Sequence, residues 1–529
     1  MKWDILDIDG SYYQDTYAVG KLTAKLLAAS DFSDEKIHEV LNTDMALSTS
    51  HSDCVLQACR RILKAKENHE KVFVGGDYDA DGICSTAIMK KTLDQLGILN
   101  GYYIPDRFKE GYGLNKKTVE LAHEKGYSLI ITVDNGVKAH EAIQRAKELG
   151  MDVIVTDHHE IEEEVEADIL VHPDFMEEEY RYLSGAGVAY EISRNLIGDH
   201  DLSLVTMCMV ALIGDVMPLY RETRKIVKKG LQLLSRGIPR SLSLLLYHPS
   251  SVTETDVAFS IVPKLNSIGR MKDSSNVNTL VSYLLCENET QLLSYSKALG
   301  KVNDERKKLS ASMSERAEGM LSDKPFEIIA DSSFEEGICG LVAGRLSNTY
   351  HKPVIVMSDN GDVLKGSGRS VPGFDMFSFL SSFEKKVAFG GHKAAVGITV
   401  NKSDYEELVS FVDENICNYE LKEENKKAVM IKPEDVSFDS VADLSLLSPY
   451  PKDMIEPDFV FVHPENVQVV KAGKTIRYVI TAQNRTIECV AFPSRNLKAV
   501  EKPELLIGKL TLNRFRGTVK LQMNLEYVE

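Results

Sequence analysis

Three aspartates alternate directly after a short apolar run, in the segment Lys-Val-Phe-Val-Gly-Gly-Asp-Tyr-Asp-Ala-Asp-Gly that begins at Lys71. They are Asp77, Asp79 and Asp81. Carboxylates this close together repel one another unless a cation lies between them. Hard oxygen ligands of this kind suit magnesium or manganese. The spacing therefore predicts a divalent metal site directly after a buried strand.

The same Asp-x-Asp-x-Asp-Gly spacing also begins the calcium loop of an EF-hand. That loop requires a bidentate Glu at its twelfth position, which is Ile88 here, and a helix in front of it, where this sequence predicts a strand. An EF-hand is therefore excluded. An acidic turn in solvent remains open for this stretch taken alone.

Two further polar clusters follow predicted strands. Asp134 follows the run 128–133, and the pair His158 and His159 follows the run 152–156. Strands that alternate with helices form parallel sheets, and the loops at their carboxyl ends gather in one crevice, so the clusters are expected to converge. Carboxylates with imidazole favour manganese. Two ions that share Asp134 as a bridging ligand would hold and activate a water for attack on phosphorus.

One more carboxylate, Asp215, ends the apolar run 210–214. It is either an ordinary helix cap or another inward-facing ligand, and the run alone leaves both readings open. The other candidate ligands from the residues alone are Asp77, Asp79, Asp81, Asp134, His158 and His159.

Composition sets the broad class of the protein. The chain has 529 residues, 43% hydrophobic and 27% charged, which is typical of a soluble globular protein with several domains. The sequence lacks an apolar run of the roughly 18–20 residues that span a bilayer, and its eight scattered cysteines suit reduced thiols in a cytoplasm. The formal charge of −17 argues against broad non-specific binding to nucleic acid and leaves room for a local basic groove.

The predicted elements give an α/β fold class. Apolar residues at helical spacing fill parts of 1–70, strands and helices alternate from Lys71 onward, and 299–321 is a long charged helix. A second α/β unit covers 325–418, a charged linker covers 420–427, and short alternating segments after it predict a small β-barrel.

Four ordered motifs resemble those of the DHH phosphoesterases: Asp77-Tyr-Asp-Ala-Asp-Gly82, Val133-Asp-Asn-Gly136, Thr156-Asp-His-His159 and Gly214-Asp-Val-Met-Pro218. The resemblance implies two divalent ions, manganese by preference and magnesium as the alternative. The implied ligands are Asp79, Asp81, Asp134, His158 and Asp215, with Asp77 close by. His159 would lie nearer to the scissile phosphate. Some members have a histidine where this chain has Gly75, so one metal is expected to have a different or weaker ligand shell.

Within that family, most of the chain resembles the RecJ group, exonucleases that degrade single-stranded DNA from the 5′ end. The segments 104–113, 265–270 and 299–321 resemble RecJ motifs. The resemblance implies five parts: a helical N-terminal segment (1–70), a parallel-sheet DHH catalytic domain (71–285), a connector helix (286–324), a DHH-associated domain (325–418) and an OB-fold barrel (428–529).

The DHH-associated segment has two glycine-rich stretches, 366–370 and 389–397. Backbone amides in such loops, with an Arg and a His, can cradle a phosphate, and a pair of tight turns is the alternative. By resemblance, Ser367 and Arg369 contact DNA phosphate, and His392 acts at the reacting phosphate with His159 and Asp134. The remaining expected substrate contacts are Arg107, Arg270, Asn303, Arg345, Ser370 and Gly391.

OB-folds bind single strands through a basic groove and stacked aromatic rings. These candidates are proposed as DNA contacts only as a group, because each of them taken alone is typical of a solvent-exposed surface residue. They are Lys471, Lys474, Arg477, Arg485, Arg514, Phe515 and Arg516.

The function that these motifs predict is a metal-dependent 5′→3′ exonuclease that degrades single-stranded DNA to nucleoside 5′-monophosphates in DNA recombination and repair. The chain is expected to be a cytoplasmic monomer without membrane contact. A phosphodiesterase acting on short oligonucleotides or cyclic dinucleotides is one alternative, which the barrel after residue 418 disfavours. A non-catalytic single-strand DNA-binding scaffold is the other, which the complete set of motif residues disfavours. Binding to a single-strand-binding protein or a helicase, and the choice between DNA and RNA, stay open.

Overall fold

The computed structural model describes residues 2–247, 252–272, 276–383, 387–419, 425–473, 475–482, 485–495, 497–515 and 518–529. The chain divides into two compact units. The larger unit comprises residues 47–217 and 226–424, and the smaller comprises 1–46, 218–225 and 425–529.

The larger unit begins with a five-stranded parallel sheet in the order β3-β2-β4-β5-β6. Its strands are β2 (Val72–Gly75), β3 (Asn100–Tyr103), β4 (Leu129–Val133), β5 (Asp152–Thr156) and β6 (Ile169–Val171). The central strands β2 and β4 are buried along their whole length, as expected where helices cover both faces of a sheet. This parallel sheet confirms the predicted α/β class.

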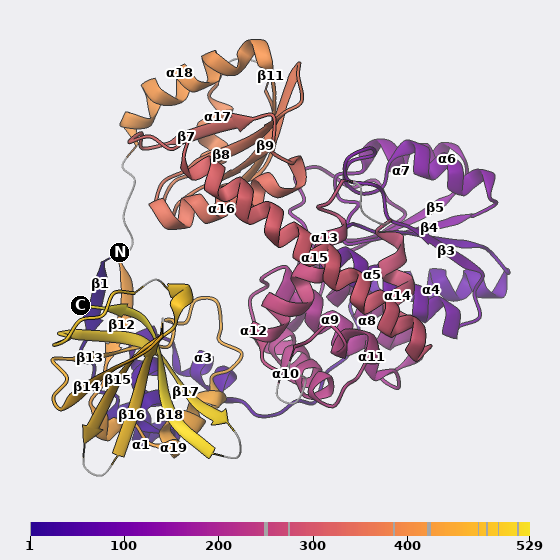
Figure 1. The fold of residues 1–529 in the computed structure, drawn as a ribbon. Coiled ribbons are helices and arrows are strands. Elements are labelled where there is room, and N and C mark those ends of the chain that lie inside the picture. Colours follow the sequence, from indigo (N-terminus) through magenta and orange to yellow (C-terminus); the bar gives the residue numbers. More distant parts are fainter. Residues whose placement is uncertain are drawn as a thin grey trace. The chain divides into compact units, whose positions relative to one another are not determined.

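Helices cover both faces of this sheet (Figure 1). On one face lie α4 (Asp53–Glu67), α5 (Ala80–Gln95) and α8 (Gly185–Ile197). On the other lie α6 (Lys116–Glu124) and α7 (His140–Glu148), whose apolar residues share a core with Phe73, Ile130 and Val153 of the strands. The sheet is therefore fixed from both sides, and its carboxyl-terminal edge carries the loops of interest.

A helical layer continues the chain beyond the sheet. Its members are α9 (Leu202–Gly214), α10 (Arg221–Ser235), α11 (Arg240–Ser243), α12 (Glu254–Asp256), the π-helical turn Val257–Ile261, α13 (Val262–Ile268), α14 (Asn278–Leu284) and α15 (Glu289–Glu318). With 30 residues, α15 is the long connector that the charged stretch predicted. Among the described helices, we find none that combines the length and the apolar character needed to cross a bilayer.

The second sheet of this unit has the order β10-β11-β9-β8-β7. Its strands are β7 (Glu327–Asp331), β8 (Val354–Asp359), β9 (Val363–Arg369), β10 (Ala388–His392) and β11 (Ala395–Asn401), and its helices are α16 (Glu336–Tyr350), α17 (Met376–Ser381) and α18 (Tyr405–Asn415). Only β7 and β8 run parallel, and the other described pairs are antiparallel. The predicted glycine-rich stretches therefore lie on paired strands, β9 on one side of β11 and β10 on the other.

The smaller unit contains an eight-stranded sheet in the order β1-β12-β13-β17-β18-β16-β15-β14. Its strands are β1 (Trp3–Leu6), β12 (Lys426–Met430), β13 (Asp458–Val462), β14 (Val467–Ala472), β15 (Thr475–Ala482), β16 (Arg485–Ala491), β17 (Leu505–Phe515) and β18 (Thr518–Val528). Helices α1 (Ser11–Tyr17), α2 (Lys21–Ser30), α3 (Asp34–Leu41) and α19 (Phe438–Asp443) complete it.

The first residues of the chain differ from the helical segment expected over 1–70. Residues Trp3 to Leu6 form strand β1, which pairs in parallel with β12, and Gly20 N donates to Asp443 Oδ2 at 2.7 Å. The short run Trp-Asp-Ile-Leu has no helical period, and its strand partner lies more than 400 residues further along the chain. Residues 1–46 therefore belong to the unit formed by the last hundred residues.

Candidate metal centre

His158 lies at the centre of the converging carboxylates. Its Nε2 is 3.2 Å from Asp134 Oδ1, 3.4 Å from Asp215 Oδ2 and 3.6 Å from Asp81 Oδ2. These residues follow β5, β4 and α9 or begin α5, so four separate segments supply them. The expected convergence at the carboxyl edge of the sheet is present in the structure.

Three overlapping groups of side chains could each hold a cation. They are Asp77 with Asp79 and Asp134, Asp81 with His158 and Asp215, and Asp134 with His158 and His159, and the ligand atoms of each group all lie within 4.8 Å of one another. Asp134 and His158 each belong to two groups. Shared ligands of this kind suit adjacent cations bridged by a carboxylate.

Three polar atoms that face this centre are not satisfied by the described part of the protein. Among the described residues, Asp77 Oδ1, Asp134 Oδ1 and His158 Nε2 are buried and have no hydrogen-bond partner. Buried polar atoms are nearly always paired, so an unpaired cluster indicates a bound species. Carboxylate oxygen and neutral imidazole are the donors that manganese and similar ions prefer, so the residues present fit a divalent metal.

Electrostatics supports the same interpretation. Burial raises the pKa of Asp77, Asp79 and Asp134 above its usual range, and the charge of the neighbouring aspartates raises it further. Burial also lowers the pKa of His158, which favours the neutral imidazole that a metal requires. A cation among these groups would offset both the desolvation and the mutual repulsion of the carboxylates.

Two local features orient the first aspartates. Asp79 is the N-cap of α5, and its Oδ1 accepts hydrogen bonds from the backbone N–H of Asp81 and of Gly82, each at 3.0 Å. Asp81 is bound by the start of α8, because its carboxylate accepts from Gly185 N at 2.8 Å and Ala186 N at 2.7 Å. The positive end of the α8 dipole therefore faces a carboxylate of the centre.

Close packing of α8 requires glycine at its first position. A Cβ at Gly185 would lie 2.5 Å from the Cβ and 2.6 Å from the Cα of Asp134. The helix start thus contacts Asp81 and Asp134 at once. The glycine-rich composition of the segment 184–188 is the sequence signal that could have indicated this contact.

His159 is oriented by a residue that was not among the predicted site residues, Asp157. Asp157 is buried, and its Oδ1 lies 2.7 Å from His159 Nδ1 while its Oδ2 accepts from Val137 N at 3.0 Å. Burial alone would lower the pKa of His159, but the hydrogen bond to Asp157 and the carboxylate charge raise it to about 9. The hydrogen bond to Asp157 thus favours the protonated form of the partly exposed His159 imidazole.

Tyr112 is a second residue that the sequence did not single out. Its hydroxyl donates to the main-chain oxygen of Asp134 at 2.9 Å, and its ring lies edge-on to His159 with centroids 5.8 Å apart. Asp134 itself has φ of 61°, in the left-handed region that few residues other than glycine and asparagine adopt readily. Tyr112 and the start of α8 therefore fix an unusual backbone conformation beside the metal centre.

Several of the predicted phosphate contacts gather as a group of arginines. Burial and the positive charges of Arg107, Arg306 and Arg369 together lower the pKa of Arg270 to about 10, so these guanidinium groups lie near one another. Guanidinium groups that repel one another in this way make a site for an anion. Asn303 is 1% exposed and its Oδ1 accepts from Arg306 at 3.0 Å, so it positions that arginine.

The remaining predicted contacts in the second sheet are placed as follows. Ser367 and Arg369 lie on β9 against Gly340 of α16, and Ser370 Oγ donates to Phe374 O at 2.7 Å. Gly391 and His392 end β10, where His392 is exposed. Arg345 lies on α16 and pairs with Glu318 at 3.6 Å.

In the smaller unit, Lys471 on β14 and Arg477 on β15 are exposed on neighbouring strands. Arg485 donates to the main-chain oxygen of Val436 at 3.1 Å. Lys474 and Arg516 lie outside the described residues. Arg514 and Phe515 belong to the end of β17, and their side chains are also outside the described part of the chain.

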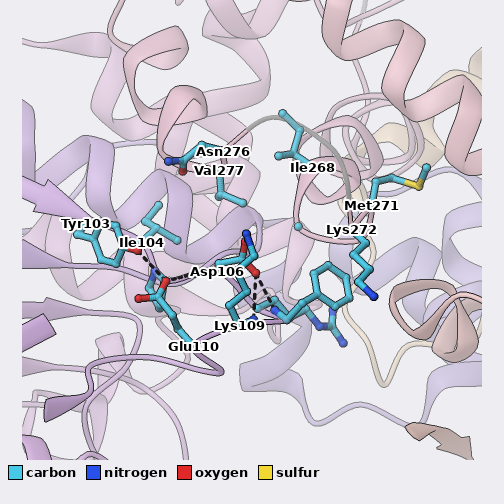
Figure 2. Close-up of a pocket in the computed structure, with 14 residues that line it drawn as sticks. Tyr103, Ile104, Asp106, Lys109, Glu110, Ile268, Met271, Lys272, Asn276 and Val277 are labelled. Atoms are coloured by element: carbon cyan, nitrogen blue, oxygen red, sulfur yellow. Dashed lines mark hydrogen bonds and ion pairs between the residues drawn. The ribbon is translucent and has the colours of Figure 1, made fainter. Parts of the chain in front are cut away.

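A polar cavity of about 470 Å³ opens between the β3–α6 loop and the segment after α13 (Figure 2). Its acidic side chains are already bonded locally: Glu110 accepts from Tyr103 and from Asp106 N, and Asp106 accepts from Phe108 N. These groups shape the loop that carries Arg107. The cavity lacks the unsatisfied ligand atoms of the metal centre.

Three family models match the chain in order. The DHH family N-terminal domain matches residues 71–213, the DHHA1 domain matches 324–418, and the RecJ OB domain matches 429–527. The first match contains Asp77, Asp134 and His158, and the second contains the glycine-rich strands.

Relatives with known names resemble most of the chain. The single-stranded-DNA-specific exonuclease RecJ of Bacillus subtilis (strain 168) is 32% identical over 88% of this chain, which spans 62% of that relative. RecJ of Haemophilus influenzae is 27% identical, with 89% of this chain and 90% of the relative covered. The crystal structure of RecJ in complex with Mn²⁺ from Thermus thermophilus has the same fold, with a TM-score of 0.84, 23% identity, and 99% and 78% of the two chains covered.

Proposed function

Because the chain belongs to the RecJ group of the DHH family, we propose that it is a divalent-metal-dependent exonuclease for single-stranded DNA. It degrades the strand from its 5′ end and releases nucleoside 5′-monophosphates. The centre holds two ions, with manganese preferred and magnesium accepted. The observation that carries this proposal is the unpaired, buried set of Asp77 Oδ1, Asp134 Oδ1 and His158 Nε2 at the carboxyl edge of the parallel sheet.

Asp77, Asp79, Asp81, Asp134, His158 and Asp215 would hold the metal. When bound, the metal supplies a water of lowered pKa and stabilises negative charge on the phosphate. The protein holds these ligands rigidly through the cap at Asp79 and the contact of α8 with Asp81. Preorganised ligands need little reorganisation during the reaction, which lowers its barrier.

His159 places a positive charge beside the centre. Because Nδ1 is bound to Asp157, its Nε2–H can donate to a phosphate oxygen and stabilise the charge that develops there. Arg107, Arg270, Arg306 and Arg369 would bind the 5′ phosphate, with Asn303 behind Arg306. Ser367, Ser370, Gly391 and His392 are proposed as further contacts with the strand. A bound 5′ phosphate would fix the distance from the strand end to the cut, which produces mononucleotides.

The test uses one single-stranded oligonucleotide labelled at its 5′ end in one sample and at its 3′ end in another, digested with Mn²⁺ beside a duplex control. The expected result is immediate release of a 5′-labelled mononucleotide, a shrinking 3′-labelled ladder and an intact duplex. Cutting confined to oligonucleotides of a few residues would instead favour a small-substrate phosphodiesterase. Tight binding without cleavage would favour a DNA-binding scaffold.

A further inference from the structure

Helix α9 ends beside the metal centre in a hydrogen-bonded turn whose cap residue is Asp215. The N–H of Met217 donates to Leu212 O at 3.0 Å. The N–H of Val216 donates to Ile213 O at 3.3 Å. These two bonds define a Schellman motif, in which the residue after the cap adopts the left-handed conformation. Val216 occupies that position, with φ of 55°.

Valine is an unfavourable residue for this position. Glycine usually occupies it, because the left-handed conformation brings the Cβ of any other residue close to the following carbonyl oxygen. In the described part of the chain, Val216 is the one β-branched residue among the non-glycine residues with positive φ. Val216 is also 64% exposed, so burial of its side chain does not offset this cost. The end of α9 is therefore strained.

A second cost falls on the same helix end. Asp215 places a carboxylate at the carboxyl end of the α9 dipole, which repels an anion, and the described last turn of α9 contains no basic residue. The Asp215 side chain is 36% exposed, against 2% for Asp81 and for Asp134, so water can solvate it when the helix end opens. Without a cation, opening of this end relieves the strain at Val216 and the repulsion at Asp215 together.

We propose that Val216 is a positioning residue that weakens one cation position of the centre, the one formed by Asp81, His158 and Asp215. This inference rests on the proposed metal-dependent function. In the metal-free protein, only the fraction of molecules with Asp215 in place can bind a cation there, and the apparent affinity falls by that fraction. The all-aspartate group does not contain Asp215, so its affinity is independent of Val216. One of the two cations is therefore the more readily exchanged.

The experiment titrates Mn²⁺ into metal-free protein and follows the electron paramagnetic resonance signal of the free ion. Val216→Gly should bind Mn²⁺ about 5- to 30-fold more tightly at one position, the factor that corresponds to the cost of a left-handed residue with a Cβ, and should leave the other position unchanged. Val216→Asn should shift the affinity in the same direction by a smaller factor, because asparagine tolerates this conformation.

Two further variants are the controls. Val216→Ile keeps the branched Cβ at the end of α9, and His351→Gly replaces an exposed left-handed C-cap residue at the end of α16, with φ of 52°. Both should bind Mn²⁺ as the wild type does. An equal gain of affinity in either control would overturn the proposal, and so would equal affinities of the wild type and Val216→Gly.

Amide hydrogen exchange separates this role from a purely structural one. Without metal, residues 213–217 should exchange faster in the wild type than in Val216→Gly by a similar factor, and Mn²⁺ should remove the difference. A difference that persists in saturating Mn²⁺ would contradict the coupling between the helix end and the cation. A wild type that binds no Mn²⁺ would refute the metal centre of the proposed function and this inference with it, whereas equal affinities would refute this inference alone.

Discussion

The Oδ1 atom of Asp157 lies 2.7 Å from Nδ1 of His159, and the same oxygen accepts from the backbone N–H of His158 at 2.8 Å and of His159 at 3.1 Å. One buried carboxylate therefore fixes both the backbone turn after β5 and the imidazole of His159. The adjacent His158 points into the metal centre. The rings of two neighbouring histidines thus have different surroundings, because only that of His159 is bound by Asp157.

Asp157→Asn should lower kcat about 10- to 100-fold, because the amide keeps the size of the side chain but cannot balance the charge of His159. Mn²⁺ binding should persist, since Asp157 is not among the grouped ligand atoms. Initial rates under saturating oligonucleotide measure the effect. Asp359→Asn, at a half-buried aspartate paired with Lys402, is the control and should keep the wild-type rate. An unchanged kcat in Asp157→Asn would show that the charge on His159 is dispensable.

Asp134→Asn should abolish cleavage, with a loss of about a thousandfold or more, while the backbone is preserved because asparagine tolerates the positive φ at this position. Without metal, the variant should unfold a few degrees above the wild type, since one buried charge in a repelling cluster is gone. Circular dichroism during heating in EDTA measures the midpoint. A lower midpoint than that of the wild type would contradict the repulsion argument.

Adding Mn²⁺ to metal-free wild type should raise its unfolding temperature, and the rise should grow with concentration, because a ligand that binds only the folded state stabilises it by about 2.7 kcal/mol at a hundred times its Kd. The shift should be largely lost in Asp134→Asn. It should remain in Asp331→Asn, which alters an ion pair with Arg316 and none of the grouped ligand atoms. Thermal scans with and without Mn²⁺ check this, and an equal shift in Asp134→Asn would place the cation elsewhere.

Gly185→Ala should lower activity more than tenfold and destabilise the larger unit by about 1–3 kcal/mol, because the new Cβ would lie 2.5 Å from the Asp134 Cβ and force α8 away from the centre. Gly300→Ala provides the matched control. Gly300 lies inside α15 and an added Cβ there meets no atom within 4 Å, so this variant should gain about 0.5–1 kcal/mol in helix stability. Denaturant midpoints and cleavage rates distinguish the two, and wild-type behaviour of Gly185→Ala would refute the close contact.

Asp458, in the smaller unit, offers a test of pH dependence. Its Oδ1 is buried without a hydrogen-bond partner among the described residues, and burial raises its pKa from 3.8 to about 6. The folded state therefore favours the protonated acid, and the stability from this group is lost as the pH rises from about 4 to 6.

Asp458→Asn stays neutral, so its free energy of unfolding should match that of the wild type near pH 4 and exceed it above pH 6, by about 3 kcal/mol at most. Thermal scans between pH 4 and 8 give the difference. Asp7→Asn, at an exposed position, should show no such trend. A difference that is constant with pH would mean that Asp458 titrates normally.

The part of the site that follows a topological rule could be predicted from the sequence. Asp77, Asp134 and His158 each follow an apolar run, and parallel strands bring their carboxyl ends to one edge. The contacts of Asp81 with the start of α8 could not be predicted, because Gly185 is 104 residues away along the chain. The spacing of apolar residues does not indicate which helix start will contact which carboxylate. Asn303 is a second residue whose tertiary contacts could not be predicted from the sequence. Its motif indicated the neighbourhood of the substrate, while its burial and its bond to Arg306 depend on tertiary packing.

Strand β1 pairs with β12, and Gly20 bonds to Asp443, across 423 residues of chain. During translation, residues 3–6 leave the ribosome long before their partner strand is made. The catalytic sheets, which lie between them in the sequence, can complete their own pairing in that interval, whereas the sheet of the smaller unit must wait for the last hundred residues. A nascent chain should therefore acquire its metal ligands before it acquires the surface that the RecJ OB domain supplies.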